Sequence, residues 1–144
     1  MALWRLYYHI VWGTKERENL ILPEQEKQLY NYIIGKSDEF GCIIHAVNGI
    51  ADHIHLIVSI PPNMAISEYV RKIKGSSSNY LNKIGSNRFA WQNGYGIFSV
   101  GVKNLEIAIR YVRNQKEHHR QNTIIKGLEM FKDDDDSPQR FYEG

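Results

Sequence analysis

Two histidines separated by one residue stand in an apolar run and could hold a metal ion. The run is His53-Ile54-His55-Leu56-Ile57-Val58. Alternate side chains of a strand point to opposite faces, so both histidines share one face, while Ile54, Leu56 and Val58 share the other. Their Cα atoms would lie roughly 6–7 Å apart, which lets both imidazoles converge on one cation. Asp52 could orient an imidazole through its second ring nitrogen, or it could simply cap backbone amides in a turn.

A tyrosine with polar neighbours at helical spacing is the second candidate. Tyr111, Gln115 and His118 stand at positions i, i+4 and i+7, hence on one flank of a helix. A tyrosine at such a position is often a core residue. As a nucleophile it would need help, because a hydroxyl with a pKa near ~10 attacks poorly at neutral pH unless its target is polarised. A metal ion at the histidine pair could polarise a phosphate.

Positive charge gathers on two segments, although the net charge is only +2. One group precedes a small-residue stretch in which backbone could approach a phosphate closely and hydroxyls could add hydrogen bonds. The candidate phosphate contacts are Arg71, Lys72, Lys74, Ser76 and Ser77, together with Arg113 from the second group. Solvated helix faces and a flexible helix break are the alternatives. Trp91 and Tyr95 could stack on bases, but large aromatics near a strand are more often core residues.

Hydrophobic periodicity predicts the order strand, helix, strand, strand, helix, strand, helix. The expected segments are Leu6–Trp12, about Pro23–Phe40, Cys42–Val47, His53–Ile60, a helix capped by Ser67 and weakened at Gly75–Ser78, Tyr95–Val100, and a last helix from about Leu105 that carries Tyr111 and Gln115. This order fits an α+β, ferredoxin-like antiparallel sheet covered by helices, with an additional C-terminal helix.

The chain has 144 residues, which suits one domain. We expect a single domain over residues 1–132 and a loosely ordered acidic tail over 133–144, where four aspartates stand together. No apolar run approaches the roughly 20 residues of a membrane span, and the N-terminus has no signal-peptide pattern. One cysteine, Cys42, excludes an internal disulfide and suits a reducing cytoplasm.

Five segments in order resemble the single-tyrosine HUH transposases of the insertion sequence 200/605 type, whose relatives include REP-associated tyrosine transposases. Asp52–Val58 resembles their histidine–hydrophobe–histidine motif, and Tyr111–Gln115 resembles their tyrosine helix. The other three segments are Tyr69–Ser77, Trp91–Tyr95 and Phe98–Val100. Five ordered blocks over most of a chain carry far more weight than any one block.

This resemblance implies that Tyr111 attacks DNA, and that His53, His55 and Gln115 hold Mg²⁺ or Mn²⁺. The product would be a 5′-phosphotyrosine link and a free 3′-hydroxyl. It also implies a single-stranded DNA partner with hairpins at the element ends, and a homodimer in which the tyrosine helix of one subunit completes the partner's site in trans.

Two other functions compete with this interpretation. A replication initiator or plasmid-transfer nickase would use the same HUH chemistry, although the short chain and the order of the motifs argue against it. A nucleic-acid-binding module without catalysis would use the same kind of sheet. Imperfect palindromes flanking the gene would favour the transposase.

Overall fold

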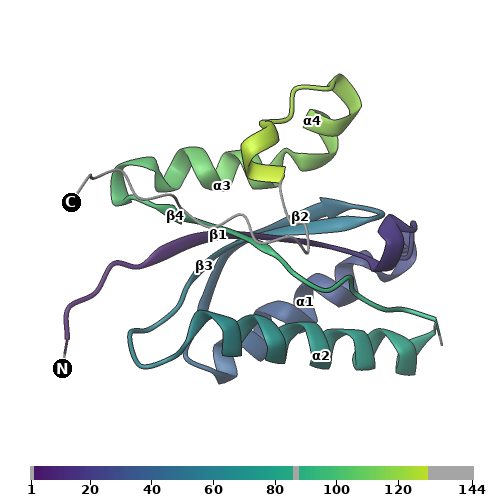
Figure 1. The fold of residues 1–144 in the computed structure, drawn as a ribbon, viewed down its shortest axis with the longest axis horizontal. Helices are drawn as coiled ribbons and strands as arrows, with labels where there is room; N and C mark the ends of the chain where they lie inside the picture. The colour runs from purple at the N-terminus through teal and green to yellow at the C-terminus, as the bar shows by residue number, and fades with distance from the viewer. Residues whose placement is uncertain (1, 86–87, 130–144) are drawn as a thin grey trace, which may run out of the picture.

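A computed structural model describes residues 2–85 and 88–129 of the chain (Figure 1). The acidic tail predicted over 133–144 lies outside the described residues. The strands and long helices are β1 (Tyr7–Gly13), α1 (Pro23–Glu39), β2 (Ile43–Ile50), β3 (His53–Ser59), α2 (Ile66–Ile84), β4 (Gly96–Val100), α3 (Leu105–Arg113) and α4 (Gln115–Gln121). Three short 3-10 turns are η1 (Lys15–Arg17), η2 (Val102–Asn104) and η3 (Lys126–Glu129).

The four strands form one antiparallel sheet in the order β2-β3-β1-β4. The two strands that neighbour in sequence, β2 and β3, pair as a hairpin, while β1 enters between β3 and β4. This order confirms the predicted ferredoxin-like α+β fold. In the β1–β3 register, Gly13 stands opposite His53 and Val11 opposite His55, so the histidine pair lies next to a central strand.

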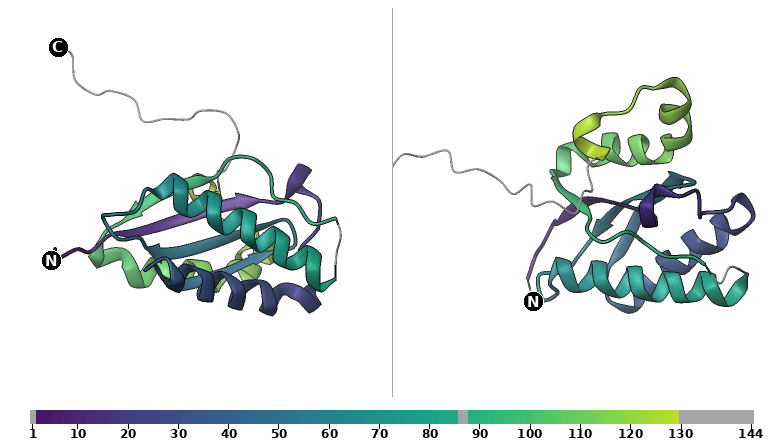
Figure 2. Two further views of the ribbon diagram at one scale, coloured as in Figure 1. Left: turned by 90° about the horizontal axis from the view of Figure 1, so that it is seen from below. Right: turned by 45° about the vertical axis from the view of Figure 1, so that its right-hand side comes forward.

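Helices cover both faces of the sheet (Figures 1 and 2). The main core lies between the sheet and α1 with α2, and includes Ile54, Leu56 and Val58 from β3. The opposite face packs against α3 through a smaller cluster that contains Ile57 of β3 and Tyr111 of α3. Because both faces are covered, every residue of β3 is buried, including the two histidines. Burial of this pair requires polar partners for the ring nitrogens.

Helix α2 runs without interruption through Gly75–Ser78, so the predicted weak middle is wrong. The hydroxyls of Ser76 and Ser77 donate to the carbonyls of Lys72 and Lys74 at 2.7 and 3.2 Å, which satisfies them inside the helix. The helix cap is Ala65 rather than Ser67. At α1, Pro23 occupies the first helical turn as predicted, and Gly41 with φ of 74° turns the chain toward β2.

The predicted last helix is two helices, because the helical conformation is interrupted at Asn114. The φ and ψ angles of Asn114 are −98° and 20°, outside the helical region. Tyr111 therefore lies on α3 and Gln115 begins α4. The break changes the helical phase between Tyr111 and the residues of α4, which decides the side chains that join the site.

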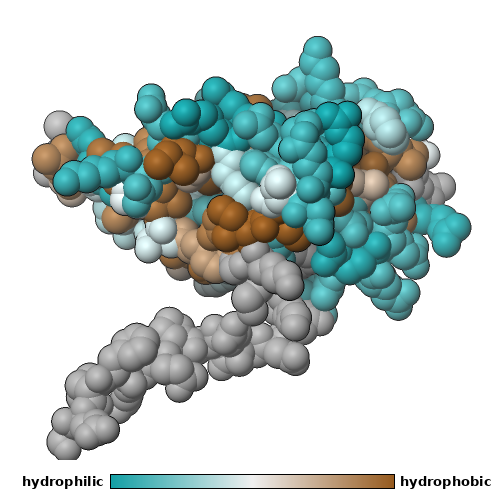
Figure 3. All heavy atoms as spheres, turned by 90° about the horizontal axis from the view of Figure 1, so that it is seen from above, coloured by the Kyte–Doolittle hydropathy of each residue, from teal (hydrophilic) through white to brown (hydrophobic). Residues whose placement is uncertain are grey.

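The surface over α3 and α4 is polar with hydrophobic interruptions (Figure 3). Val102 of η2 and Ile107 of α3 are each 60% exposed.

No helix within the described ranges is long and apolar enough to cross a membrane.

Candidate active site

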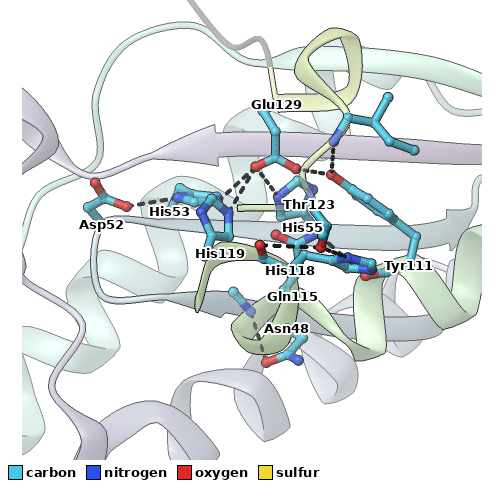
Figure 4. Close-up of polar contacts among 12 residues, drawn as sticks. Asn48, Asp52, His53, His55, Tyr111, Gln115, His118, His119, Thr123 and Glu129 are labelled. Carbon is cyan, nitrogen blue, oxygen red and sulfur yellow. Dashed lines mark hydrogen bonds and ion pairs between the residues drawn. The ribbon is translucent and has the colours of Figure 1, made fainter. Parts of the chain in front are cut away.

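The two histidines of β3 each have one ring nitrogen anchored, which leaves the other facing the same space (Figure 4). His53 Nδ1 lies 2.8 Å from the Asp52 carboxylate, and Asp52 is held in turn by Arg17 at 3.1 Å. His55 Nδ1 lies 2.7 Å from Nε2 of His9 on β1. The Nε2 atoms of His53 and His55 are consequently the ones turned into the site. Of the two alternatives for Asp52, orienting an imidazole is the one that the side-chain contact matches.

His9 is a site residue that no motif in the sequence indicates. It is 2% exposed and its ring stands between those of His55 and Phe98. Period-two alternation places His9 and Val11 on one face of β1, but only the pairing of β1 with β3 shows that this is the face of the histidine pair. A neutral imidazole nitrogen can either donate or accept a hydrogen bond. His9 can therefore accept from His55 Nδ1 when that nitrogen carries the proton, and donate to it when it does not.

Tyr111 points at the same cluster from α3. Its hydroxyl donates to Glu129 Oε2 at 2.5 Å and accepts the backbone N–H of Ile125 at 3.1 Å. The other carboxylate oxygen of Glu129 lies 3.2 Å from His53 Nε2 and 3.1 Å from His55 Nε2. Glu129 therefore joins the tyrosine to the histidine pair (Figure 4).

Helix α4 contributes His119 rather than the predicted flank residue His118. His119 Nε2 lies 3.2 Å from Glu129 Oε1, whereas the His118 ring stacks on that of Tyr111 with centroids 4.7 Å apart. Gln115 is fully buried, and its Nε2 donates to the Tyr111 carbonyl at 3.4 Å. Its side-chain oxygen has no hydrogen-bond partner among the described residues.

Burial and local charges set the protonation of the site. Burial lowers the pKa of His9 to about 3, with His55 adding to the effect. Burial also lowers the pKa of His53, but hydrogen bonds to Asp52 and Glu129 outweigh it and leave that pKa raised. Burial followed by the Glu129 hydrogen bond raises the pKa of Tyr111 to about 12. The phenol is thus protonated at neutral pH, and its attack requires a polarised phosphate.

The donor set fits a divalent metal ion. Ligand atoms of His53, His55, His119 and Glu129 all lie within 4.8 Å of one another. The buried side-chain oxygen of Gln115 is a further possible metal ligand, because it has no hydrogen-bond partner within residues 2–85 and 88–129 and buried polar atoms rarely stay unpaired. Imidazole, carboxylate and amide oxygen are all ligands of divalent metals.

Comparison with known proteins decides the family. The model of the family "Transposase IS200 like" matches residues 2–115. The chain belongs to the IS200-like transposase family. Membership places it among the enzymes that cleave DNA and transfer its strands.

Individual relatives agree with the family model. The chain is 30% identical to the transposase of insertion sequence element IS200 from Salmonella typhimurium LT2 over 121 residues, which cover 79% of each chain. It is 23% identical to the ISDra2 transposase TnpA of Deinococcus radiodurans, over 80% of this chain and 87% of that one. A solved structure of a REP-associated tyrosine transposase bound to a REP hairpin matches with a TM-score of 0.61 at 17% identity. That match covers 86% of this chain and 76% of the other, and it bears out the fold.

The predicted phosphate contacts of this transposase lie mostly on α2, across the sheet from the histidines. Arg71 is exposed, while Lys72 pairs with Glu68 at 3.0 Å. Lys74 donates to the carbonyls of Gln92 and Gly94 at 2.6 and 2.9 Å, so it also anchors the segment before β4. Their role in DNA binding stays a prediction.

The remaining predicted phosphate contacts differ in how far other residues of the protein already occupy their polar groups. Ser77 is fully buried and accepts the indole N–H of Trp91 at 2.9 Å, and Ser76 donates within α2. Trp91 also packs edge-on against Trp12, as a core aromatic does. Arg113 is exposed at the end of α3, on the same side of the sheet as Tyr111.

Proposed function

We propose that this transposase cleaves single-stranded DNA with Tyr111 as nucleophile, at a divalent metal site held by His53, His55 and Gln115. One observation carries the proposal: the two oxygens of a single carboxylate, Glu129, join the Tyr111 hydroxyl to Nε2 of both histidines. The proposed nucleophile and the histidine pair are thus linked through a single intervening side chain. The family membership supplies the reaction class.

In the proposed reaction the Tyr111 oxygen attacks the DNA phosphorus and forms a 5′-phosphotyrosine bond. The bond from phosphorus to the 3′ oxygen breaks, the phenol loses its proton, and the 3′ oxygen leaves as a hydroxyl. When bound, the metal ion acts as a Lewis acid on the phosphate. The covalent link conserves the phosphodiester energy, so a free 3′-hydroxyl can later attack phosphorus, release Tyr111 and rejoin strands without ATP.

The side chains around the histidines orient the site. Asp52 and His9 hold the Nδ1 atoms, so that Nε2 of each ring is available as a ligand. The Ile125 N–H on the Tyr111 oxygen fixes the hydroxyl position and would stabilise negative charge that develops there. Mg²⁺ and Mn²⁺ are the ions that we propose for this site.

The proposed substrate is a folded single strand with hairpins at the element ends. Support comes from the solved REP-associated transposase, whose structure holds a REP hairpin. Exposed Arg71 and Arg113 are suited to phosphate contacts, because guanidinium groups match phosphate geometry.

We also propose a homodimer with sites shared in trans. The groups of α3 to η3 that reach the site, namely Tyr111, Gln115, His119 and Glu129, follow Gly101 in the chain, and a bend there would carry them together onto a partner's sheet. The backbone at Gly101 is not crowded by other segments, because a Cβ added there would meet no atom within 4 Å. Exposed Val102 and Ile107 lie on this same segment and offer apolar surface to a second subunit.

The test uses single-stranded oligonucleotides that span the imperfect palindromes flanking the gene. With Mn²⁺ or Mg²⁺, wild-type protein should form a covalent protein–DNA adduct on denaturing gels, and duplexes of the same sequence should give none. Tyr111→Phe should abolish the adduct. Tyr32→Phe is the matched control, because Tyr32 stacks on Tyr80 away from the site. An unchanged adduct in Tyr111→Phe would remove this tyrosine from the role of nucleophile.

A further inference from the structure

Three imidazole nitrogens surround one carboxylate oxygen in this site. Glu129 Oε1 lies 3.2, 3.1 and 3.2 Å from the Nε2 atoms of His53, His55 and His119. An anionic carboxylate oxygen offers about two lone-pair directions. Three ring nitrogens around it exceed what it can accept, so hydrogen bonding alone leaves the cluster poorly satisfied. A cation among the four donor atoms satisfies all of them.

The distances from Glu129 Oε1 match those between neighbouring ligands of a coordination shell, and all four ligand atoms lie within 4.8 Å of one another. Ligands around an ion with bonds of about 2.1 Å stand about 3.0–3.4 Å apart, whether the shell is octahedral or tetrahedral. The three distances from Glu129 Oε1 to the imidazoles fall within that range. His119 is 21% exposed at its side chain and Glu129 11%, so the arrangement is largely shielded from water.

The second oxygen of Glu129 is committed to Tyr111. The hydroxyl donates to Oε2 at 2.5 Å and receives the Ile125 N–H at 3.1 Å. These two contacts leave the phenol little freedom to rotate. Through Glu129, the position of the Tyr111 oxygen is therefore tied to the position of whatever the histidines bind.

We propose that His119 and Glu129 join His53, His55 and Gln115 as ligands of one ion, so that three imidazoles, a carboxylate and an amide oxygen surround it, and that this site prefers Mn²⁺ to Mg²⁺ and positions Tyr111. This inference rests on the proposed function and extends it. The family match ends at residue 115, so neither added ligand lies within the matched region. Imidazole nitrogen suits transition metals, whereas Mg²⁺ favours oxygen ligands and keeps its waters, which accounts for the preference.

The experiment measures metal binding on the full chain without DNA. Calorimetric titrations with Mn²⁺ and with Mg²⁺ compare wild type with His119→Ala and Glu129→Gln. Controls are His45→Ala, whose ring pairs with Ser59, and Glu117→Gln on α4. Loss of either proposed ligand should weaken Mn²⁺ binding by about 100-fold, the upper end of what even indirect partners of metal ligands cost. The controls should bind as wild type does.

Pulsed electron paramagnetic resonance on the Mn²⁺-loaded wild type identifies the ligands without any substitution, so misfolding of a variant cannot affect the result. Coupling to three histidine nitrogens supports the inference, and coupling to two overturns it. Wild-type Mn²⁺ affinity in His119→Ala and Glu129→Gln, with affinity lost in His53→Ala, would overturn the added ligands and leave the proposed function intact. Wild-type affinity in His53→Ala would instead contradict the proposed function. Tighter binding of Mg²⁺ than of Mn²⁺ would overturn the metal preference.

Discussion

Replacing His9 with phenylalanine should weaken metal binding without touching any proposed ligand. His9 is buried, and its Nε2 lies 2.7 Å from Nδ1 of His55. For His55 Nε2 to offer its lone pair to an ion, the proton must sit on Nδ1 and find an acceptor. The low pKa of His9, about 3, keeps it neutral and able to accept. Phenylalanine fills the space but accepts nothing.

The size of the effect follows from the buried Nδ1–H group. Leaving it without a partner costs about 1–3 kcal/mol, and His55 can avoid that cost by moving its proton to Nε2, which then cannot bind the ion. Mn²⁺ affinity should fall by about 5–150-fold, since about 1.4 kcal/mol is tenfold.

Calorimetric titration at neutral pH measures this change, with thermal melts of the metal-free protein as a check on folding. His9→Gln should recover most of the affinity, because its amide oxygen can accept the same hydrogen bond. His45→Phe changes a half-buried strand histidine elsewhere and should have no effect. Equal losses in His9→Gln and His9→Phe, or wild-type affinity in His9→Phe, would refute the tautomer argument.

Other perturbations test separate parts of the account. Mn²⁺ affinity should fall as the pH drops from about 8 to about 6, because the raised pKa of His53 means that the ion must displace a proton there; a flat titration profile would count against His53 as ligand. His53→Ala/His55→Ala protein mixed with Tyr111→Phe protein should regain part of the cleavage if sites form in trans, while no recovery in a heterodimer verified by mass would show cis assembly. Gly49→Ala should destabilise the protein by more than about 1–3 kcal/mol, since its Cβ would come 2.2 Å from the His53 carbonyl oxygen; an unchanged denaturation midpoint would contradict that clash. Lys74→Met should cost about 1.5–3 kcal/mol through two lost carbonyl hydrogen bonds, and a loss of hairpin affinity at unchanged stability would instead favour a direct DNA contact.

Local patterns predicted the parts of this molecule that depend on near neighbours in sequence. Alternation in β1 and β3 placed the strands to within one residue of their ends, and it put His53 and His55 on one face. The serines of α2 misled because their composition is typical of a helix break, whereas in the structure each hydroxyl bonds back to the preceding turn. Burial of Tyr69, Ile73 and Leu81 then holds the helix together.

The rest of the site depends on contacts between distant segments. His9 joins His55 only through the β1–β3 register. His119 and Glu129 join through the break at Asn114 and a left-handed turn at Asn122, with φ of 56°, which returns η3 over the histidines. Asparagine tolerates the left-handed conformation that Asn122 adopts, so this residue was a signal for a helix end. No sequence pattern shows which side chain a changed helical phase will bring to the sheet.

The most direct test of the central claim is to locate the covalent bond between protein and DNA. Wild-type transposase is reacted with a flanking-palindrome oligonucleotide and Mn²⁺, digested with protease and nuclease, and analysed by tandem mass spectrometry. We predict one modified peptide, with the nucleotide joined through its 5′-phosphate to the oxygen of Tyr111. A link to any other residue, or a link through a 3′-phosphate, would contradict it.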